Sequence, residues 1–233
     1  MSKRFLRKRC VYCGKQGVSS TGDHVIARGF FLPPQRANLP QVPSCAQCNN
    51  EKSRLEHYLM TVLPFGARHA AARRTMDELV PPRLNKNARL HRELLDAWDK
   101  QWRGDYAPRE SSSMALPLHC ERVTRLCEYI MVGLAWHHWE ADLAPPIQLR
   151  ASFFNHAGVM AFEKLFADSR WGRRLDVTLG AGTFTYRAAQ DSGAPSRTIW
   201  RFSIYGMVLG GVPGQPHVLA DAVFGLSIPI FAG

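Results

Sequence analysis

The spacing of hydrophobic and polar positions differs between parts of the chain. Near the N-terminus, two short apolar pieces, Val25–Ile26 and Leu39–Val42, have the length of β-strands. From Asn49 onward the apolar residues recur at spacings of three and four, and Pro64 ends this pattern. Residues 1–66 are therefore predicted to contain two strands followed by one amphipathic helix.

The middle of the chain has a helical pattern that is rich in arginine. A first basic helix is expected after Gly66, and Pro81-Pro82 interrupts it. A second helical pattern covers Asn85 to Arg103, with leucine and tryptophan on one face. A serine cluster at 111–113 indicates a boundary, so residues 67–113 are predicted to form a basic helical connector.

The rest of the chain combines helical and strand patterns. Helical spacing covers Leu116 to Glu140 and Ala157 to Phe166. Three later stretches, 175–189, 197–211 and 217–231, are rich in β-branched and aromatic residues and are separated by turn-forming residues. We therefore expect an α+β fold in which residues 114–233 form a C-terminal domain of helices and an antiparallel sheet.

Composition narrows the class of protein. The chain has 233 residues, of which 45% are hydrophobic and 21% charged, as in globular proteins that bury a core without disulfides. The longest apolar runs are shorter than the roughly 18 residues of a membrane span, and the basic start lacks the apolar segment of a secretion signal. We expect a cytoplasmic protein without a membrane segment.

The positive charge is concentrated at one end. Residues 1–92 hold 17 Lys and Arg against 5 Asp and Glu, whereas the remaining residues hold 13 against 14. A basic region of this kind attracts phosphate backbones, although it can also be a solvated surface. A nucleic acid is therefore the expected partner. The residues after Gly66 that could line a phosphate track are Arg68, Arg73, Arg74, Arg83, Lys86, Arg89 and Arg92.

Four of the six cysteines occur in pairs with the spacing of metal ligands. Cys10 and Cys13 form one CxxC pair, and Cys45 and Cys48 form the other. Two residues between the cysteines let both thiolates face one ion, and two such pairs complete the tetrahedron of a closed structural zinc site. Disulfides are the weaker interpretation for a protein of a reducing compartment.

Four segments in this order resemble a known family. They are CVYC, GDHVIARGF, VPSCAQC and NNEKS, and they resemble the zinc-containing subset of the HNH endonucleases, which have the ββα-metal fold. The resemblance covers about residues 8–66. It implies a metal-dependent endonuclease that hydrolyses phosphodiester bonds in DNA, with a structural Zn²⁺ and a separate catalytic Mg²⁺ or Mn²⁺.

The resemblance also implies a role for individual residues. His24 matches the general base, and its ordinary pKa near 6.5 suits that role. Asp23 and Asn49 match the ligands of the catalytic divalent ion, because oxygen ligands suit magnesium. Asn38 is the nearest match to the asparagine that orients the histidine, and Gln41 is a possible substitute. The expected phosphate-binding residues are Lys52, Ser53 and Arg28.

Simpler interpretations remain open for these residues. Asp23 follows Gly22 and can be a turn residue, and Asn49 can cap the helix. In that case the N-terminal part is a zinc-containing module that binds DNA or RNA without cleaving it. The C-terminal domain is expected to supply specificity, a protein partner or a homodimer interface.

Overall fold

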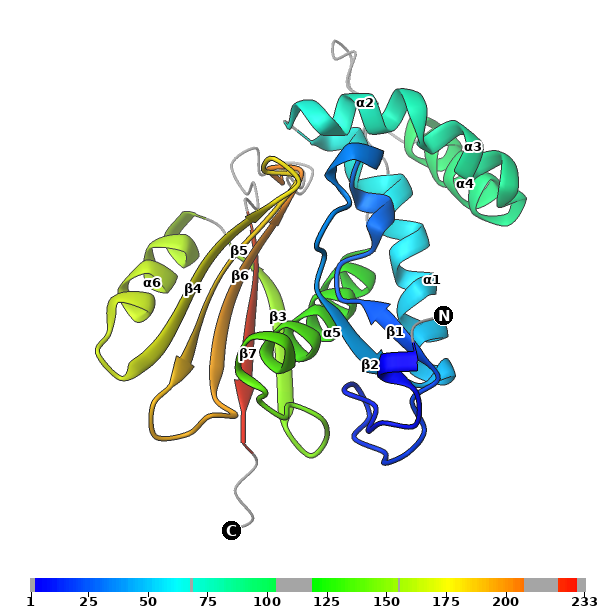
Figure 1. Ribbon diagram of the computed structural model, residues 1–233. Helices are drawn as coiled ribbons and strands as arrows, with labels where there is room; N and C mark the ends of the chain where they lie inside the picture. The colour runs from blue at the N-terminus through cyan, green and yellow to red at the C-terminus, as the bar shows by residue number, and fades with distance from the viewer. Residues whose placement is uncertain (1–2, 68, 104–118, 155, 208–221, 230–233) are drawn as a thin grey trace.

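The computed structural model describes residues 3–67, 69–103, 119–154, 156–207 and 222–229 (Figure 1). Its N-terminal part contains a short antiparallel hairpin of β1 (Thr21–His24) and β2 (Gln41–Ser44), followed by α1 (Ala46–Val62). Four 3₁₀ helices join these elements: η1 (Lys3–Phe5), η2 (Arg28–Phe30), η3 (Pro33–Gln35) and η4 (Leu63–Gly66). The expected order of two strands and a helix is present.

The hairpin is displaced along the chain from the predicted strands. β1 ends at His24 rather than beginning near it, and β2 runs to Ser44. The register pairs His24 with Gln41 and Asp23 with Val42. Because successive side chains of a strand point to opposite faces, His24 and Asp23 lie on different faces of the hairpin.

Three helices follow, α2 (Ala70–Glu78), α3 (Val80–Lys86) and α4 (Ala88–Arg103). The predicted break at Pro81-Pro82 is present, since α2 ends at Glu78 and both prolines lie in the first turn of a new helix, α3. A proline there has no intrahelical hydrogen bond to lose, and its fixed φ suits a helix start.

The C-terminal part is a five-stranded antiparallel sheet with a helix on each face. Its helices are α5 (Cys120–Trp139) and α6 (His156–Ala167). The strands, in spatial order, are β3 (Gln148–Phe154), β7 (Ala222–Ile228), β6 (Thr198–Ile204), β5 (Phe184–Asp191) and β4 (Trp171–Leu179). The predicted α+β fold is therefore confirmed, although β3 was not predicted and the first expected strand region divides into β4 and β5.

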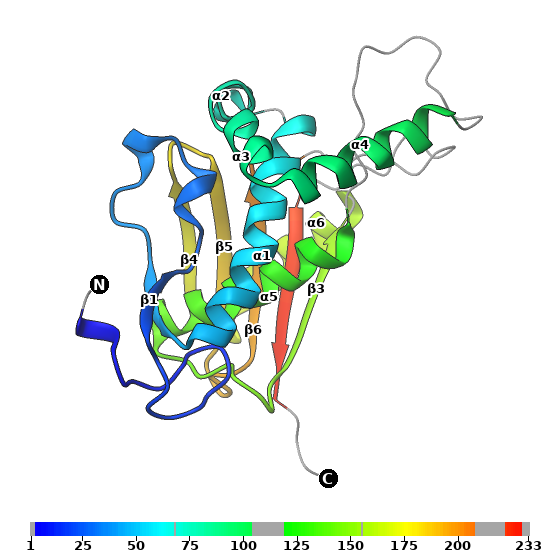
Figure 2. The ribbon, with the colours of Figure 1, turned by 90° about the vertical axis from the view of Figure 1, so that its right-hand side faces the viewer.

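Helix α5 lies in the middle of the molecule (Figures 1 and 2). One side of it packs against α1 and β2, and another packs against β3 and β7. This explains why its sequence is apolar nearly all round, with a run of buried residues from Tyr129 to Ala135. One hydrophobic cluster extends from Cys10 and Val25 through α5 to Trp200 and Val223 on the sheet.

The boundaries predicted at residues 66 and 113 stay predictions, and residue 113 lies outside the described part of the chain. None of the described helices is long and apolar enough to cross a membrane.

Gly133 of α5 packs directly against Val25 of the N-terminal part. A Cβ atom at this position would lie 2.7 Å from Cγ1 and 2.9 Å from Cγ2 of Val25. We expect Gly133→Ala to destabilise the protein by about 1–3 kcal/mol through overpacking, despite the better helix propensity of alanine. Denaturant unfolding measures this change. In the double variant with Val25→Ala, most of the destabilisation caused by Gly133→Ala should disappear. A Gly133→Ala protein that is more stable than the wild type would contradict this packing.

Candidate metal centre and histidine site

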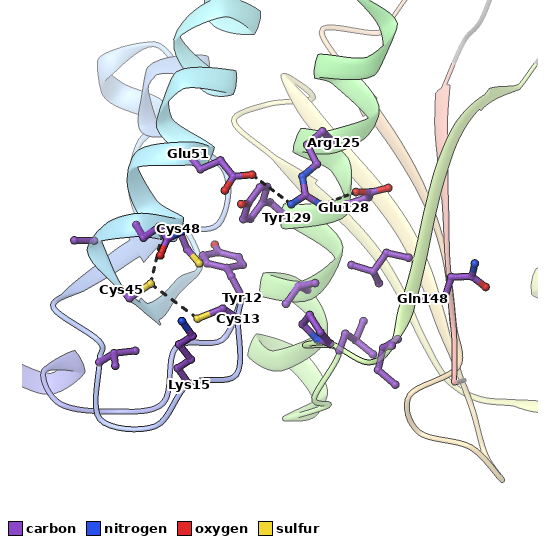
Figure 3. Close-up of a pocket in the computed structure, with 18 of the residues that line it drawn as sticks. Tyr12, Cys13, Lys15, Cys45, Cys48, Glu51, Arg125, Glu128, Tyr129 and Gln148 are labelled. Carbon is purple, nitrogen blue, oxygen red and sulfur yellow. Dashed lines mark hydrogen bonds and ion pairs between the residues drawn. The ribbon is translucent and has the colours of Figure 1, made fainter. Parts of the chain in front are cut away.

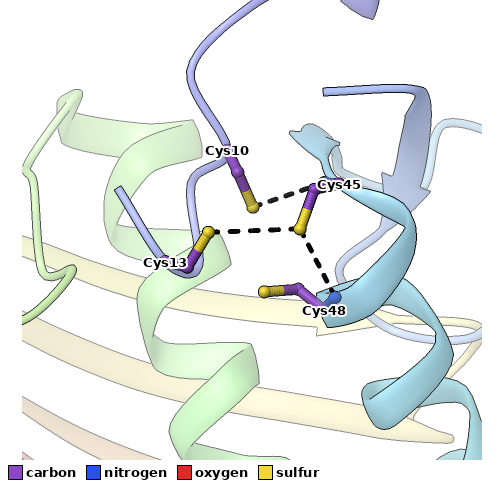
Figure 4. A group of neighbouring side chains, drawn as sticks. All are labelled: Cys10, Cys13, Cys45 and Cys48. Atoms are coloured by element: carbon purple, nitrogen blue, oxygen red, sulfur yellow. Dashed lines mark hydrogen bonds between the residues drawn. The ribbon is translucent and has the colours of Figure 1, made fainter. Parts of the chain in front are cut away.

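Four cysteines from two separate segments meet at the start of α1 (Figure 4). Their sulfur atoms all lie within 4.8 Å of one another. The Sγ atoms of Cys13 and Cys45 are 4.0 Å apart. A tetrahedron with Zn–S bonds near 2.3 Å places the sulfurs about 3.8 Å apart. The geometry is therefore compatible with a structural zinc ion.

Backbone N–H groups point at these sulfurs. The N–H of Cys45 donates to Sγ of Cys10 over 3.3 Å, and the N–H of Cys48 donates to Sγ of Cys45 over 3.5 Å. Cys45 is the N-cap of α1, so the helix start and the cysteine cluster share one residue. The two CxxC pairs join the loop before β1 to the first turn of α1.

The cluster favours a cation over four protonated thiols. Burial alone raises the pKa of Cys10, but hydrogen bonds from backbone N–H groups, that of Cys45 first, bring it below its ordinary value. The pKa of Cys48 is raised well above its ordinary value by burial and by the adjacent Cys45. Negative charge at one sulfur thus opposes ionisation of the next, and a bound cation relieves this repulsion.

His24 is half-buried at the end of β1, and two contacts fix it. Its Nε2 lies 2.7 Å from Nε2 of Gln41, its partner across the hairpin. Its carbonyl oxygen accepts a hydrogen bond of 2.8 Å from Nζ of Lys52. Partial burial and then the positive charge of Arg28 lower the pKa of His24 below its ordinary value. The imidazole is therefore neutral at neutral pH.

The residue that contacts the histidine ring is Gln41 and not Asn38. Asn38 is exposed in the loop before β2 and has a left-handed φ of 55°. Asparagine tolerates this conformation better than most residues, which gives Asn38 a role in the turn. Gln41, which the sequence offered only as a substitute, supplies the side-chain amide beside His24.

Asp23 faces the opposite side of the hairpin, toward α1. It is 8% exposed, and its Oδ2 accepts a 2.5 Å hydrogen bond from the hydroxyl of Tyr12. The same oxygen lies 3.0 Å from Nζ of Lys52, which is fully buried and also forms an ion pair with Glu56. Sequence analysis missed Tyr12 and Glu56. The spacing of four between Lys52 and Glu56 is the signal that could have found the latter.

This network contains two carboxylates and one ammonium. Burial by itself lowers the pKa of Lys52, but the charges of Glu56 and Asp23 raise it above its ordinary value. Burial raises the pKa of Glu56 to about 7, with Lys52 opposing the rise and Asp23 adding to it. The ammonium therefore stays charged, and Glu56 is the group that takes up a proton to balance the network.

The other predicted site residues have different surroundings. Asn49 and Ser53 are half-buried on α1, and Arg28 is exposed in η2. The enclosed ammonium of Lys52 already faces three protein oxygens. The ammonium of Lys52 is therefore less accessible to a phosphate than the exposed guanidinium of Arg28.

The predicted phosphate track after Gly66 divides into residues with different contacts. Arg83 donates to the carbonyl oxygens of Met60 and Gly29 over 2.7 and 2.5 Å, so it joins α3 to η2 and α1. Arg74 pairs with Glu78 on its own helix. The remaining described members, Arg73, Lys86, Arg89 and Arg92, are exposed, and residue 68 lies outside the described part.

A cavity of about 800 Å³ lies beside the cysteine cluster, between α1, α5 and the start of β3 (Figure 3). Cys13, Cys45 and Tyr129 are among its lining residues. On its wall, Arg125 of α5 bonds both Glu51 of α1 and Glu128. His24 is not among the described residues that line it, so this cavity is separate from the histidine site.

Comparisons with protein-family models, curated proteins and solved structures find no match to this chain. The metal centre and the histidine site therefore have to be interpreted from their own geometry.

We expect purified protein to contain about one tightly bound zinc ion per chain. Cys45→Ser should lose this ion and destabilise the N-terminal part, because a hydroxyl is a poor zinc ligand. Serine is a good N-cap, so the substitution removes the metal ligand but keeps the helix cap. Metal analysis and thermal unfolding measure both effects. Cys120→Ser, at an exposed cysteine outside the cluster, is the control; a zinc-free, fully folded wild type would contradict the metal centre.

Glu56→Gln should change how stability depends on pH. The pKa of Glu56 in the folded protein is raised to about 7, so its contribution to stability is present at acid pH and is lost as the pH rises through 7. The glutamine variant keeps an acceptor for Lys52 without the charge. It should match the wild type near pH 4, below the unfolded-state pKa, and exceed it by about 3 kcal/mol at pH 8. Denaturant unfolding of both proteins at both pH values tests this. An equal difference in unfolding free energy between variant and wild type at the two pH values would show that Glu56 does not titrate in this range.

Proposed function

We propose that this protein is an HNH-type endonuclease that hydrolyses phosphodiester bonds in DNA, with His24 as its general base. The observation that carries the proposal is the fixed, neutral imidazole of His24. Its ring contacts Gln41 at 2.7 Å and its backbone contacts Lys52 at 2.8 Å. A general base must be neutral and correctly placed before it can take a proton from the attacking water.

The contact with Gln41 supports this role. A side-chain amide has a donor and an acceptor end, so it can satisfy either tautomer of the imidazole. In the structure, the amide nitrogen of Gln41 lies against Nε2 of His24. A half-turn of the side-chain amide exchanges its nitrogen and oxygen, and in that orientation the oxygen of Gln41 accepts the Nε2–H of His24. The lone pair of Nδ1 is then available to a water molecule. Gln41 is thus a positioning residue for His24.

The proposed ligands of a magnesium or manganese ion are Asp23 and Asn49. Because Asp23 and the ring of His24 lie on opposite faces of the hairpin, the ion and the base would have to reach the substrate from either side of the end of β1. Asp23 uses Oδ2 for Tyr12 and Lys52, and its Oδ1 takes part in neither contact. Asn49 lies three residues before Lys52 on α1, hence on the helix face that Lys52 turns toward Asp23. Oxygen donors from both elements suit these ions. Such an ion supplies Lewis-acid stabilisation of the phosphate charge.

Arg28 is the proposed contact for the cleaved phosphate. It is exposed, and it is close enough to His24 for its charge to lower the pKa of that residue. A guanidinium binds phosphate through two parallel hydrogen bonds. The same charge therefore keeps the base neutral and attracts the substrate.

A second candidate is a zinc-containing module that binds nucleic acid without cleaving it. The observation in its favour is the ion pair between Asp23 and Lys52 at 3.0 Å. In this arrangement an ammonium already neutralises the carboxylate that the nuclease needs as a metal ligand. In both candidates we assign the four-cysteine cluster to a structural zinc ion, which fixes the hairpin to α1.

His24→Ala separates these two candidates. It removes the base and leaves the cysteines and the basic residues in place. Cleavage of supercoiled plasmid with magnesium or manganese should fall by about 10²- to 10⁴-fold, while DNA affinity stays within a few fold. Equal cleavage by wild type and variant would exclude His24 as the base. Binding without cleavage by the wild type would favour the binding module.

Gln41→Glu is a matched test of the positioning role. A carboxylate beside the imidazole favours its protonated form, so the acid limb of the cleavage profile should move to higher pH. Gln41→Ala should lower the rate without moving the profile in this direction. An unchanged profile for Gln41→Glu would show that residue 41 does not act on His24.

A further inference from the structure

A second basic surface lies on another side of α1. A hollow of about 710 Å³ lies between α1, α4 and the start of α5, and a hollow of about 510 Å³ adjoins it between α4 and α5; both are lined by Arg89, Glu93 and Arg122. Because they share these three residues, they form one continuous hollow, which we call the arginine groove. Figure 2 shows the three helices that surround it.

The arginine groove contains guanidinium groups that form no ion pair within the described part of the chain. Arg54 of α1 and Arg89 of α4 are exposed and make no ion pair with any residue that the structure describes. Arg92 donates only from Nε, to the carbonyl oxygen of Ala88 in its own helix. These three side chains therefore have N–H donors directed to solvent.

A fourth arginine is held in place by its neighbours. The guanidinium of Arg122 lies 4.3 Å from the ring centre of Tyr58 and 3.1 Å from Oε1 of Glu93. The N–H of His119 donates to the hydroxyl of Tyr58 over 3.1 Å. These contacts connect α1, α4 and α5, so the arginine groove has fixed walls. The two lining carboxylates, Glu93 and Asp96, are fewer than the four arginines.

We propose that the arginine groove binds the phosphodiester backbone of a nucleic acid, away from the bond that is cut. The inference rests on the proposed function for the identity of the polymer. A groove whose four arginines come from three different helices, with two lining carboxylates, fits a chain of phosphates better than a single small anion. The planar N–H forks of arginine bind phosphate oxygens in pairs.

The arginine groove and Lys52 lie on different sides of α1. Arg54 is two residues from both Lys52 and Glu56, which is about 200° around an α-helix from each. Lys52 and Glu56 face the hairpin that carries His24. The groove is therefore a second binding surface and not an extension of the histidine site.

The test uses the full-length, zinc-containing His24→Ala protein, which keeps substrates intact. Its affinity for a short duplex DNA and for a single-stranded RNA is measured between 50 and 200 mM salt. Adding Arg54→Gln and Arg89→Gln should lower the log–log salt slope for the bound polymer by about 2, since each lost phosphate contact removes about 0.9 for a duplex. The affinity ratio between the two ends of this salt range should shrink by about tenfold.

The matched control is Lys164→Gln with Arg173→Gln, which removes two exposed charges on α6 and β4. This control should leave the salt slope unchanged. The double variant Arg54→Lys with Arg89→Lys keeps both positive charges, so it should have the salt slope of the parent protein. Zinc content and unfolding temperature verify that all variants are folded. An unchanged slope in the glutamine variant, or no salt-dependent binding of either polymer, would overturn the arginine groove. Cleavage by the wild type reports on the nuclease independently, and comparison of the two polymers identifies DNA or RNA as the ligand.

Discussion

The buried ammonium of Lys52 is the contact on which the proposed histidine site depends. Removing a charge from water costs several kcal/mol even after the protein relaxes. Here the cost is offset by the carbonyl oxygen of His24 and by the carboxylates of Asp23 and Glu56. The first two are consecutive residues of β1, and the third lies one turn further along α1. The side chain of Lys52 therefore fixes the end of β1 to α1. By binding the backbone carbonyl of His24, it also fixes the backbone orientation of this residue.

The cysteine cluster and Lys52 connect the same two parts of the fold at different points. The cysteines join the loop before β1 to the first turn of α1, and Lys52 joins the end of β1 to the second turn. Two connections one turn apart fix both the position and the rotation of the helix. The hairpin is too short to form a core of its own. Its apolar residues complete the cluster that α5 shares with the large sheet, so the orientation of His24 depends on packing over the whole molecule.

The sequence predicted the features that follow from local spacing. The CxxC pairs predicted the cysteine cluster because the ligands of each pair lie on a single turn, and helical periodicity predicted α1, α4 and α6 closely. Contacts across the hairpin depend on register, which the sequence leaves open. The register that pairs His24 with Gln41 places Gln41, and not Asn38, beside the histidine ring. The burial of Lys52 could not be predicted from neighbouring residues either, because it results from the packing of β1 against α1. Both differences arise in tertiary structure.

The number of positive charges in the sequence likewise does not tell which of them are available to a ligand. Among the arginines of the basic region, Arg83 serves the fold by binding two carbonyl oxygens, whereas Arg54 and Arg89 stay available. The available charges lie on two sides of α1, with Arg28 near His24 and the arginine groove opposite. An α-helix with its side chains is about 10–12 Å across, so a polymer bound at both surfaces has to extend past α1. In the proposed nuclease, binding strength and bond cleavage therefore depend on different residues, and each can change without the other.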